Sequence, residues 1–265
     1  MTDAEILPAE LRRDRIRGRL DSRGYVRVAD IARDFAVSSV TARTDLDALV
    51  EAGVARRVHG GAVAAGAVPE SPVEQSVQTG MESKRAIGRR AASLVDSGQS
   101  VFLDVGSTAL AVAEALVERT ELHDVVVITN GLSTALALEP GLPRLTVYVT
   151  GGALRPLQHS LVNPMGQQLI GSVHADVAIL GCNGVDVEAG ITNVNLPEAE
   201  IKRAMVEASD RVVITADASK LGRVTLGHVA VLSDVETIVT DAAADVELVA
   251  ELRQAGARVE LAGDL

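Results

Sequence analysis

Apolar residues recur at helical spacing in the first quarter of the chain. The residues of two successive stripes are Ile31, Ala32 and Phe35, followed by Ala42, Leu46 and Leu49 at i, i+4 and i+7. Ser38 suits the N-cap of the second helix, and Gly53 suits its C-terminal stop. A further helix is predicted over about residues 9–22, with Ile16 and Leu20 on its inner face. The pattern therefore predicts a small core of three helices.

The pattern then changes to that of strands. Residues 54–63 alternate between apolar and polar positions, and Gly60 and Gly61 stand at the turn of a predicted hairpin. We expect the helices and the hairpin to form one domain over residues 8–63. The small, polar and proline-containing stretch 64–82 is predicted to be a linker.

From residue 83 onwards, predicted strands and helices alternate. Near-continuous apolar runs predict strands at 101–105, 125–129, 145–149, 177–181, 211–215, 237–241 and 258–261. Such unbroken runs are typical of parallel strands that are buried on both faces, with helices between them. We therefore expect residues 83–265 to form a mainly parallel α/β domain.

The second helix of the N-terminal domain has a polar outer face near its start. A helix that reads DNA enters the major groove with its N-terminal end, and a basic hairpin beside it contacts the backbone or minor groove. The candidate DNA contacts are Ser38, Ser39, Thr41, Arg43 and Thr44 on the helix, and Arg56, Arg57, His59 and Gly60 on the hairpin. Any compact helical triplet shows similar apolar stripes, but the agreement of caps and hairpin with the helices favours DNA binding.

Two short motifs carry a family resemblance. Residues 41–46 read T-A-R-T-D-L, and residues 57–62 read R-V-H-G-G-A. With them, residues 12–63 resemble the winged helix-turn-helix of DeoR-type bacterial transcriptional regulators, whose patterns are T-[IA]-R-x-D-L and R-x-H-G-G-A. The chain departs from the family at Thr44, where a second basic residue is usual, so we expect one phosphate contact fewer.

The charge of the chain is distributed unevenly. The formal net charge is −11, but residues 1–61 carry a net charge of +1 and the remainder carries −12. This asymmetry fits a chain in which one domain faces nucleic acid and the other does not. An acidic balance is equally ordinary for a soluble bacterial protein, so charge alone does not decide.

The remaining composition excludes several classes of protein. Cys182 is the single cysteine, so no intramolecular disulfide forms, and the five histidines show no metal-ligand spacing. No signal-peptide run and no apolar stretch of membrane-spanning length is present. We expect a cytoplasmic protein without a metal, a cofactor or a membrane partner.

Polar and glycine residues follow the predicted strands of the second domain, and ligands collect at the carboxyl ends of such strands. The candidate effector-binding residues are Asp104, Gly106, Ser107, Thr108, Thr129, Asn130, Gly151, Gly152, Arg155, Asp186, Glu198, Lys202 and Lys220. Backbone N–H groups where a helix opens at residues 106–108 suit a phosphate, and Asp104 suits sugar hydroxyls. Each signal alone is more typical of a tight turn, and their shared location is what favours a site.

The DeoR resemblance extends over nearly the whole chain. Blocks at 84–88, 103–108, 128–130, 151–155, 190–192, 198–205 and 216–222 match those that recur in the family. The resemblance implies an effector domain that is similar in fold to sugar-phosphate isomerases such as ribose-5-phosphate isomerase. It also implies that this domain senses a phosphorylated sugar. It implies a repressor of carbohydrate-metabolism genes that binds double-stranded operator DNA. Bacterial operators are commonly repeated half-sites matched to protein symmetry, so we expect a homo-oligomer.

Two alternatives of other classes stay open. In the first, the second domain is a sugar-phosphate isomerase, with Asp186, Glu198 and Lys202 as candidate acid, base and lysine groups and the N-terminal domain as an attachment. Glu198 and Lys202 are spaced i, i+4, so they also suit a simple ion pair on one helix face. In the second, the domain binds a dinucleotide, but no G-x-G-x-x-G follows any predicted strand.

Overall fold

The computed structural model describes residues 7–58, 60–65 and 72–263. Within these ranges, the N-terminal domain contains three helices and a three-stranded antiparallel sheet of order β1-β3-β2. The elements are α1 (Ala9–Arg23), β1 (Tyr25–Arg27), α2 (Val28–Asp34), α3 (Ser39–Glu51), β2 (Ala55–Val58) and β3 (Gly61–Ala64). The core holds the predicted inward residues Ile16, Leu20, Ile31, Ala42, Leu46 and Leu49. The helices and hairpin expected from the sequence are confirmed, and β1 is an addition to them.

Local signals in the sequence set the limits of α3. The side chain of Ser38 accepts a hydrogen bond of 3.0 Å from the backbone N–H of Thr41, which satisfies an otherwise free donor at the helix start. Gly53 follows the helix end with φ +69°, a conformation that favours glycine. Asp45 lies on the inner face of α3 and accepts hydrogen bonds from Arg12 and Arg13 of α1. This buried ion pair joins the two helices.

A sheet of seven parallel strands forms the centre of the described part of the C-terminal domain. Its order is β15-β14-β12-β9-β4-β5-β6, and every neighbouring pair is parallel. The strands are β4 (Ser100–Leu103), β5 (Val125–Thr129), β6 (Leu145–Val149), β9 (Ala175–Gly181), β12 (Ser209–Thr215), β14 (Thr237–Asp241) and β15 (Arg258–Ala262). The mainly parallel α/β domain predicted from the apolar runs is confirmed.

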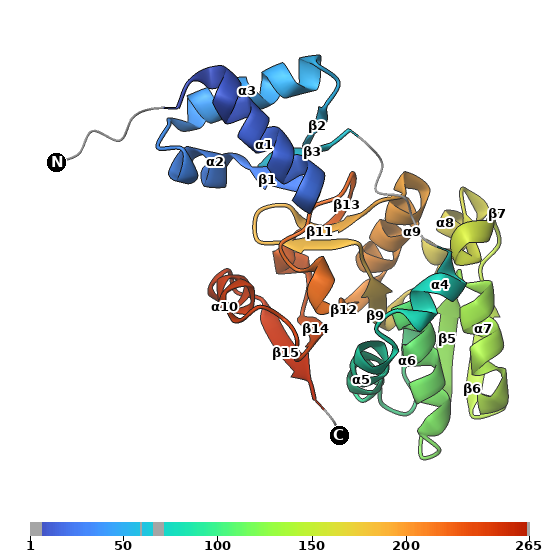
Figure 1. The fold of residues 1–265 in the computed structure, drawn as a ribbon. Coiled ribbons are helices and arrows are strands. Elements are labelled where there is room, and N and C mark those ends of the chain that lie inside the picture. The colour runs from blue at the N-terminus through green and yellow to red at the C-terminus, as the bar shows by residue number, and fades with distance from the viewer. Residues whose placement is uncertain (1–6, 59, 66–71, 264–265) are drawn as a thin grey trace.

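Helices cover both faces of this sheet, as Figure 1 shows. The helices are α5 (Met81–Ala92), α6 (Ser107–Glu118) and α7 (Leu132–Leu138) on one face, and α8 (Met165–Ile170), α9 (Leu196–Glu207) and α10 (Val246–Gln254) on the other. Along β9, Val177 and Ile179 pack in the core beneath α5, α6 and α7, whereas Ala178 and Leu180 pack in the core beneath α8, α9 and α10. Because both sets are apolar, the strand shows no polar alternation in the sequence.

Short strands that the sequence did not indicate add two smaller sheets. An antiparallel sheet contains β10 (Gly184–Asp186), β11 (Gly190–Asn193) and β13 (Gly227–Ala230), and a second pairs β7 (Ala153–Arg155) with β8 (Ser160–Val162). Strands of three or four residues are too short to show a period.

The predicted linker is partly helical. Residues 73–78 form α4 (Val73–Gln78), and α5 begins at Met81. The side chain of Val73 is buried, which fixes α4 against the C-terminal domain. The stretch predicted as a linker over residues 64–82 therefore contributes structure to the second domain, and residues 66–71 lie outside the described residues.

The two domains are in contact. β1 and β3 of the N-terminal domain lie over the β10–β11 side of the C-terminal domain (Figure 1). Tyr25 and Val63 pack with Ala189 and Val224 in one small apolar cluster. Beside this cluster, the guanidinium group of Arg27 donates hydrogen bonds to the carboxylate of Asp186, which is completely buried.

Candidate ligand cleft and nucleic-acid surface

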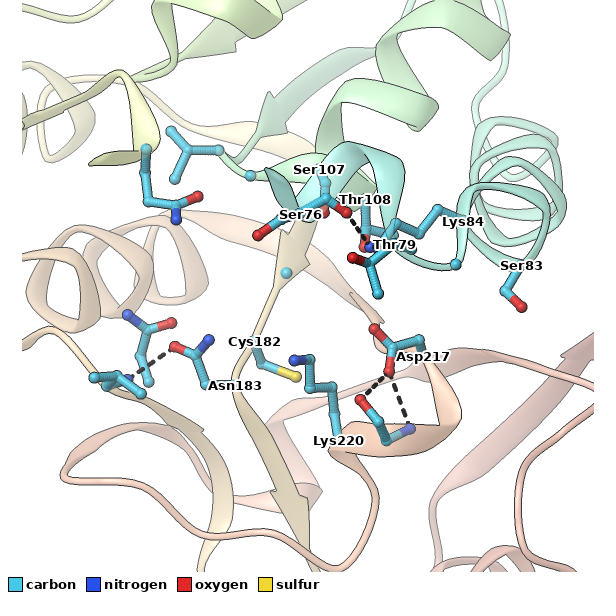
Figure 2. A pocket seen from close by; sticks show the side chains of 18 of the residues that line it. Ser76, Thr79, Ser83, Lys84, Ser107, Thr108, Cys182, Asn183, Asp217 and Lys220 are labelled. Carbon is cyan, nitrogen blue, oxygen red and sulfur yellow. Dashed lines mark hydrogen bonds between the residues drawn. The ribbon is translucent and has the colours of Figure 1, made fainter. Parts of the chain in front are cut away.

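The order of the strands creates a crevice in the C-terminal domain. The chain runs from β4 outward to β5 and β6, and then returns to the other side of β4 to form β9. Ligands of open parallel sheets bind beyond the carboxyl ends of the strands at such a reversal. A cleft of about 580 Å³ lies at this place, lined by residues that directly follow β4 and β9 (Figure 2).

Six of the predicted effector-binding residues line this cleft. They are Gly106, Ser107, Thr108, Glu198, Lys202 and Lys220. Ser107 is the first residue of α6, and Gly106 precedes it with φ +94°, so the loop turns sharply into the helix. Backbone N–H groups at the start of a helix of 12 residues face the cleft, which gives this wall a partial positive charge.

All of the lysines in the chain, Lys84, Lys202 and Lys220, line the same cleft. Burial lowers the pKa of Lys84, the carboxylate of Asp217 opposes this shift, and the nearby charge of Lys220 adds to it. Among the described residues, the Lys220 ammonium group makes no hydrogen bond or ion pair. Two ammonium groups that disfavour each other across a cleft are typical of a site for an anion.

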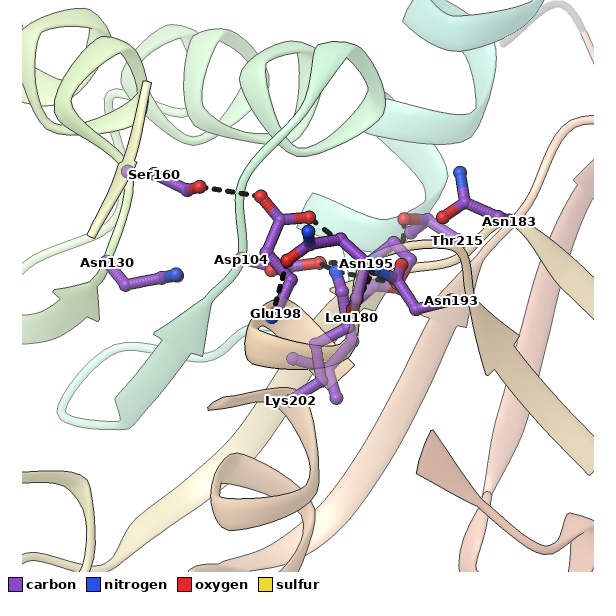
Figure 3. A network of polar contacts seen from close by, with 12 residues as sticks. Asp104, Asn130, Ser160, Leu180, Asn183, Asn193, Asn195, Glu198, Lys202 and Thr215 are labelled. Atoms are coloured by element: carbon purple, nitrogen blue, oxygen red, sulfur yellow. Dashed lines mark hydrogen bonds and ion pairs between the residues drawn. The ribbon is translucent and has the colours of Figure 1, made fainter. Parts of the chain in front are cut away.

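Lys202 is held at the base of the cleft by a buried ion pair. Its ammonium group donates to Oδ2 of Asp104 and, at 3.1 Å, to the carbonyl oxygen of Gly181 (Figure 3). Complete burial raises the pKa of Asp104, and the charge of Lys202 opposes that shift. Asp104 therefore positions Lys202, and its side chain is not among those that line the cleft.

Glu198 is held in a network of its own. Its Oε1 accepts hydrogen bonds from Arg155 and, at 2.6 Å, from the hydroxyl group of Ser160. Its backbone N–H donates to the side chain of Asn195, which caps α9 as in Figure 3. Arg155 does not line the cleft, and it contacts Glu198, which does.

The other predicted effector residues lie outside the cleft. Thr129 accepts a hydrogen bond from the backbone N–H of Gly131, and Asn130 donates to the carbonyl oxygen of Leu161, so both shape the turn after β5. Gly152 adopts φ +139° close to the carbonyl oxygen of Val162. The remaining two are Gly151, beside Met165, and Asp186, which binds Arg27 of the N-terminal domain.

Several cleft residues were not among the predicted ones. They include Ser76 in α4, Thr79 directly after α4, Lys84, Asn183, Asn193 and Asp217. Lys84 reaches this wall because its ammonium group donates to the carbonyl oxygens of Ser76 and Thr79. The rarity of lysine in the chain is a signal that points to Lys84, whereas the contribution of α4 depends on the way the chain folds back.

Cys182 lines the cleft beside Lys220 (Figure 2). Burial raises the pKa of its thiol to about 12, so the group is neutral at physiological pH. Within the described ranges, no three His, Cys, Asp or Glu side chains stand together as a metal site. Among the described helices, none is long and apolar enough to cross a membrane.

Four of the residues predicted for DNA contact, Ser39, Arg43, Arg57 and Gly60, line one cavity of the N-terminal domain. Ser38, Ser39, Arg43 and Thr44 are exposed along the first turns of α3, and Thr41 is half-buried. Arg56 and Arg57 are exposed on β2, and Gly60 stands at the hairpin turn; His59 lies outside the described residues. Arg57 donates to the carboxylate of Asp47 and to the carbonyl oxygen of Arg43, which ties the hairpin to α3.

A helix with a polar leading end beside a basic hairpin, joined to a parallel α/β domain with a cleft, defines a DNA-binding transcriptional regulator with a sensor domain. Residues 12–67 match the family described as the DeoR-like helix-turn-helix domain, and residues 79–242 match the DeoR C terminal sensor domain. The chain belongs to the DeoR family of transcriptional regulators.

Relatives in the same family are similar over nearly their whole length. The transcriptional regulator GolR of Listeria innocua is 32% identical over 95% of this chain and 98% of that protein. The transcriptional regulator GlpR of Haloferax volcanii is 35% identical over 96% and 98%. The glycerol-3-phosphate regulon repressor of Escherichia coli is 30% identical over 90% and 93%.

Solved structures are similar at a lower level. Ribose 5-phosphate isomerase A of Methanocaldococcus jannaschii is 17% identical, with a TM-score of 0.39 over 54% of this chain and 55% of the isomerase. The chain thus spans about half of that isomerase. A likeness this weak gives no ground for assigning the isomerase activity to this chain.

Proposed function

We propose that the cleft binds a phosphorylated sugar and that this ligand controls the binding of the protein to operator DNA. The convergence of every lysine of the chain on one cleft carries the proposal. Lys220, Lys84 and the N-terminal end of α6 offer positive charge and N–H donors to a phosphate group. The names of relatives that act on a glycerol-3-phosphate regulon support a small phosphorylated polyol.

The rest of the cleft is suited to hydroxyl groups. Asn183, Asn193 and Asp217 offer amide and carboxylate groups from the wall opposite α6. Such groups donate to and accept from the hydroxyls of a polyol. A cleft that offers ammonium groups together with amide and carboxylate groups fits a ligand with a phosphate and several hydroxyls.

The proposed ligand site is tested by thermal-shift measurements. The panel contains glycerol 3-phosphate, ribose 5-phosphate, glucose 6-phosphate and fructose 1-phosphate, with the unphosphorylated compounds and inorganic phosphate as controls. We expect one phosphorylated member to raise the unfolding temperature of the wild type. Lys220→Gln should weaken its affinity by about tenfold or more, because a charged hydrogen bond is lost.

Arg89→Gln is the matched control for this variant. It removes a positive charge from an exposed position of α5 outside the cleft, and its ligand response should equal that of the wild type. The proposal fails if no phosphorylated compound stabilises the wild type, or if Lys220→Gln responds as the wild type does.

We infer that the sensor domain acts by binding and does not catalyse a reaction. The relatives are transcriptional regulators, and Glu198 and Lys202, the candidate acid–base groups, are both engaged in structural pairs with Arg155 and Asp104. A coupled assay with ribose 5-phosphate should detect no turnover. Turnover that Glu198→Gln abolishes would establish the isomerase alternative instead.

The same proposal places the protein in the cytoplasm as a homo-oligomer on repeated DNA half-sites, because symmetric operators match symmetric proteins. β6 is an edge strand of the large sheet, and Tyr148 and Val149 on it are 56% and 42% exposed. An edge strand with exposed apolar side chains presents unpaired backbone groups to another chain. We place the second copy of the protein along β6.

A further inference from the structure

The β10–β11 hairpin, residues 184–193, extends from the ligand cleft to the N-terminal domain. At its base, Asn183 and Asn193 line the cleft, and the side chain of Asn183 accepts a hydrogen bond of 2.8 Å from the backbone N–H of Val194. The two strands pair along their length from Gly184 opposite Thr192 to Asp186 opposite Gly190. Since β11 also pairs with β13, the hairpin belongs to a three-stranded sheet that extends from the cleft to the N-terminal domain.

The far end of the hairpin is fixed to the N-terminal domain by a buried ion pair. Oδ2 of Asp186 accepts hydrogen bonds from Arg27, one of them at 2.7 Å from Nε. Oδ1 of Asp186 accepts from the backbone N–H groups of Glu188 and Ala189, each at 2.9 Å. The carboxylate therefore determines the shape of the hairpin end and holds the first residue before α2.

Glu188 extends from this end to the surface predicted to contact DNA. It lines a cavity of about 330 Å³ together with Ser39, Arg43, Arg57 and Gly60. A Cβ atom placed on Gly60 would lie 2.6 Å from Oε2 of Glu188, so the carboxylate contacts the hairpin turn. A carboxylate thus stands among the arginines at the leading end of α3.

The cavity that Glu188 lines has the groups that bind a DNA phosphate. Phosphate groups bind at arginines and at the N-terminal ends of helices, which are the groups that surround this cavity. Two anions that approach the same cationic groups repel each other. A carboxylate at this place therefore disfavours the approach of a DNA phosphate.

We propose that the β10–β11 hairpin couples the ligand cleft to DNA binding, with the Arg27–Asp186 pair holding a closed state in which Glu188 blocks the phosphate-binding surface. In the open state the pair is broken and Glu188 withdraws. A ligand that contacts Asn183 and Asn193 changes the position of the hairpin base and thereby the populations of the two states. This step rests on the proposed function of the cleft.

The proposal is tested on the full-length protein without any ligand. The probe is a fluorescent duplex that the wild type selects from a random-sequence pool, and its Kd is measured by anisotropy. Glu188→Gln should bind about three- to tenfold more tightly than the wild type, because a like charge is removed from the phosphate site. Glu207→Gln removes the same charge from an exposed position on α9 and should bind as the wild type does.

Asp186→Asn tests the ion pair itself. The amide keeps an oxygen that accepts from the N–H groups of Glu188 and Ala189, while the charge that binds Arg27 is lost. We expect tighter DNA binding and a larger radius of gyration in small-angle X-ray scattering. Because the side chain of Glu188 is exposed, Glu188→Gln remains a valid test if Asp186→Asn does not fold. Wild-type affinity in Glu188→Gln would overturn the proposal.

Failure of this proposal and failure of the proposed ligand site are separate outcomes. The DNA measurements on Glu188→Gln need no sugar phosphate, and the thermal-shift measurements on Lys220→Gln need no DNA. When the stabilising panel compound is added, the ratio of DNA Kd values with and without it should be smaller in Glu188→Gln than in the wild type. An equal ratio would show that the hairpin does not carry the signal.

Discussion

Single groups that line the cleft have chemical properties that their residue type alone does not give. Cys182 is the clearest case, because burial raises the pKa of its thiol to about 12. Only the thiolate reacts with alkylating reagents, so its reactivity follows the thiolate fraction. A solvated thiol has a pKa of about 8.5 and is mostly ionised above about pH 9.

The alkylation of Cys182 should therefore depend on pH over an unusual range. Its rate with iodoacetamide should keep rising with pH between pH 8 and about 10, since the pH stays below the thiol pKa throughout. Intact-mass spectrometry measures the rate, and the panel compound that stabilises the protein should slow it. A rate that levels off by about pH 9 would show that the thiol is solvated.

Thr44 is the second residue whose effect is open to measurement. It is exposed on α3, and its hydroxyl group donates to the carbonyl oxygen of Val40. The family pattern usually has a basic residue at this position, so Thr44 lacks the positive charge that would contact a phosphate. Thr44→Arg should add one phosphate contact and steepen the slope of log K against log salt by about one unit. An unchanged slope in anisotropy titrations would contradict this expectation.

At the scale of elements, close packing of α5 against α6 depends on one glycine. A Cβ atom on Gly88 would lie 2.6 Å from the backbone carbonyl group of Ala111 in α6. Gly88→Ala should therefore push the helices apart and lower the free energy of unfolding by about 1–3 kcal/mol. Calorimetry or urea unfolding followed by circular dichroism measures the change.

Gly18 in α1 provides the opposite case. No atom lies within 4 Å of a Cβ placed there, and the residue is at an exposed position in the middle of α1. Gly18→Ala should raise the stability of the N-terminal domain by about 0.5–1 kcal/mol, because the unfolded chain loses freedom without any clash. Equal effects of the two substitutions would refute the packing explanation.

At the scale of the whole molecule, assembly through β6 is open to a direct test. The wild type should have a mass in solution that is a multiple of 27.6 kDa, measured by light scattering after gel filtration. Tyr148→Asp should reduce it to that of one chain, because a charge on the edge strand disfavours pairing. Val246→Asp on α10, where the valine is 81% exposed, is the control and should keep the wild-type mass.

A monomeric wild type, or a Tyr148→Asp variant of unchanged mass, would place the second copy elsewhere or exclude it.

The interdomain contact gives a second effect at this scale. Arg27 and Asp186 are far apart in the sequence and lie in different domains, so their ion pair forms only when the two domains pack together, and Glu188 lines the cavity beside α3 in this packed arrangement.

The sequence by itself determined the parts that depend on local chemistry. Apolar periodicity marked the three N-terminal helices and all seven strands of the parallel sheet, since burial of one or both faces leaves a direct imprint on the residues. Ser38 and Gly53 marked the ends of α3 because capping involves only neighbouring residues. The residues at 106–108 were placed in a site because strand ends of a parallel sheet meet at one edge.

Only the tertiary structure decided which strand-end residues share the cleft. Thr129, Asn130 and Gly151 follow strands as Ser107 does, but the reversal of strand order between β4 and β9 puts the cleft elsewhere. Lys84 and α4 line the cleft because the chain folds back over the sheet. Asp186 lies outside the cleft, where it binds Arg27 of the other domain. Contacts between residues far apart in the chain leave no period or spacing in the sequence, so their pairing is set by the packing of the whole fold.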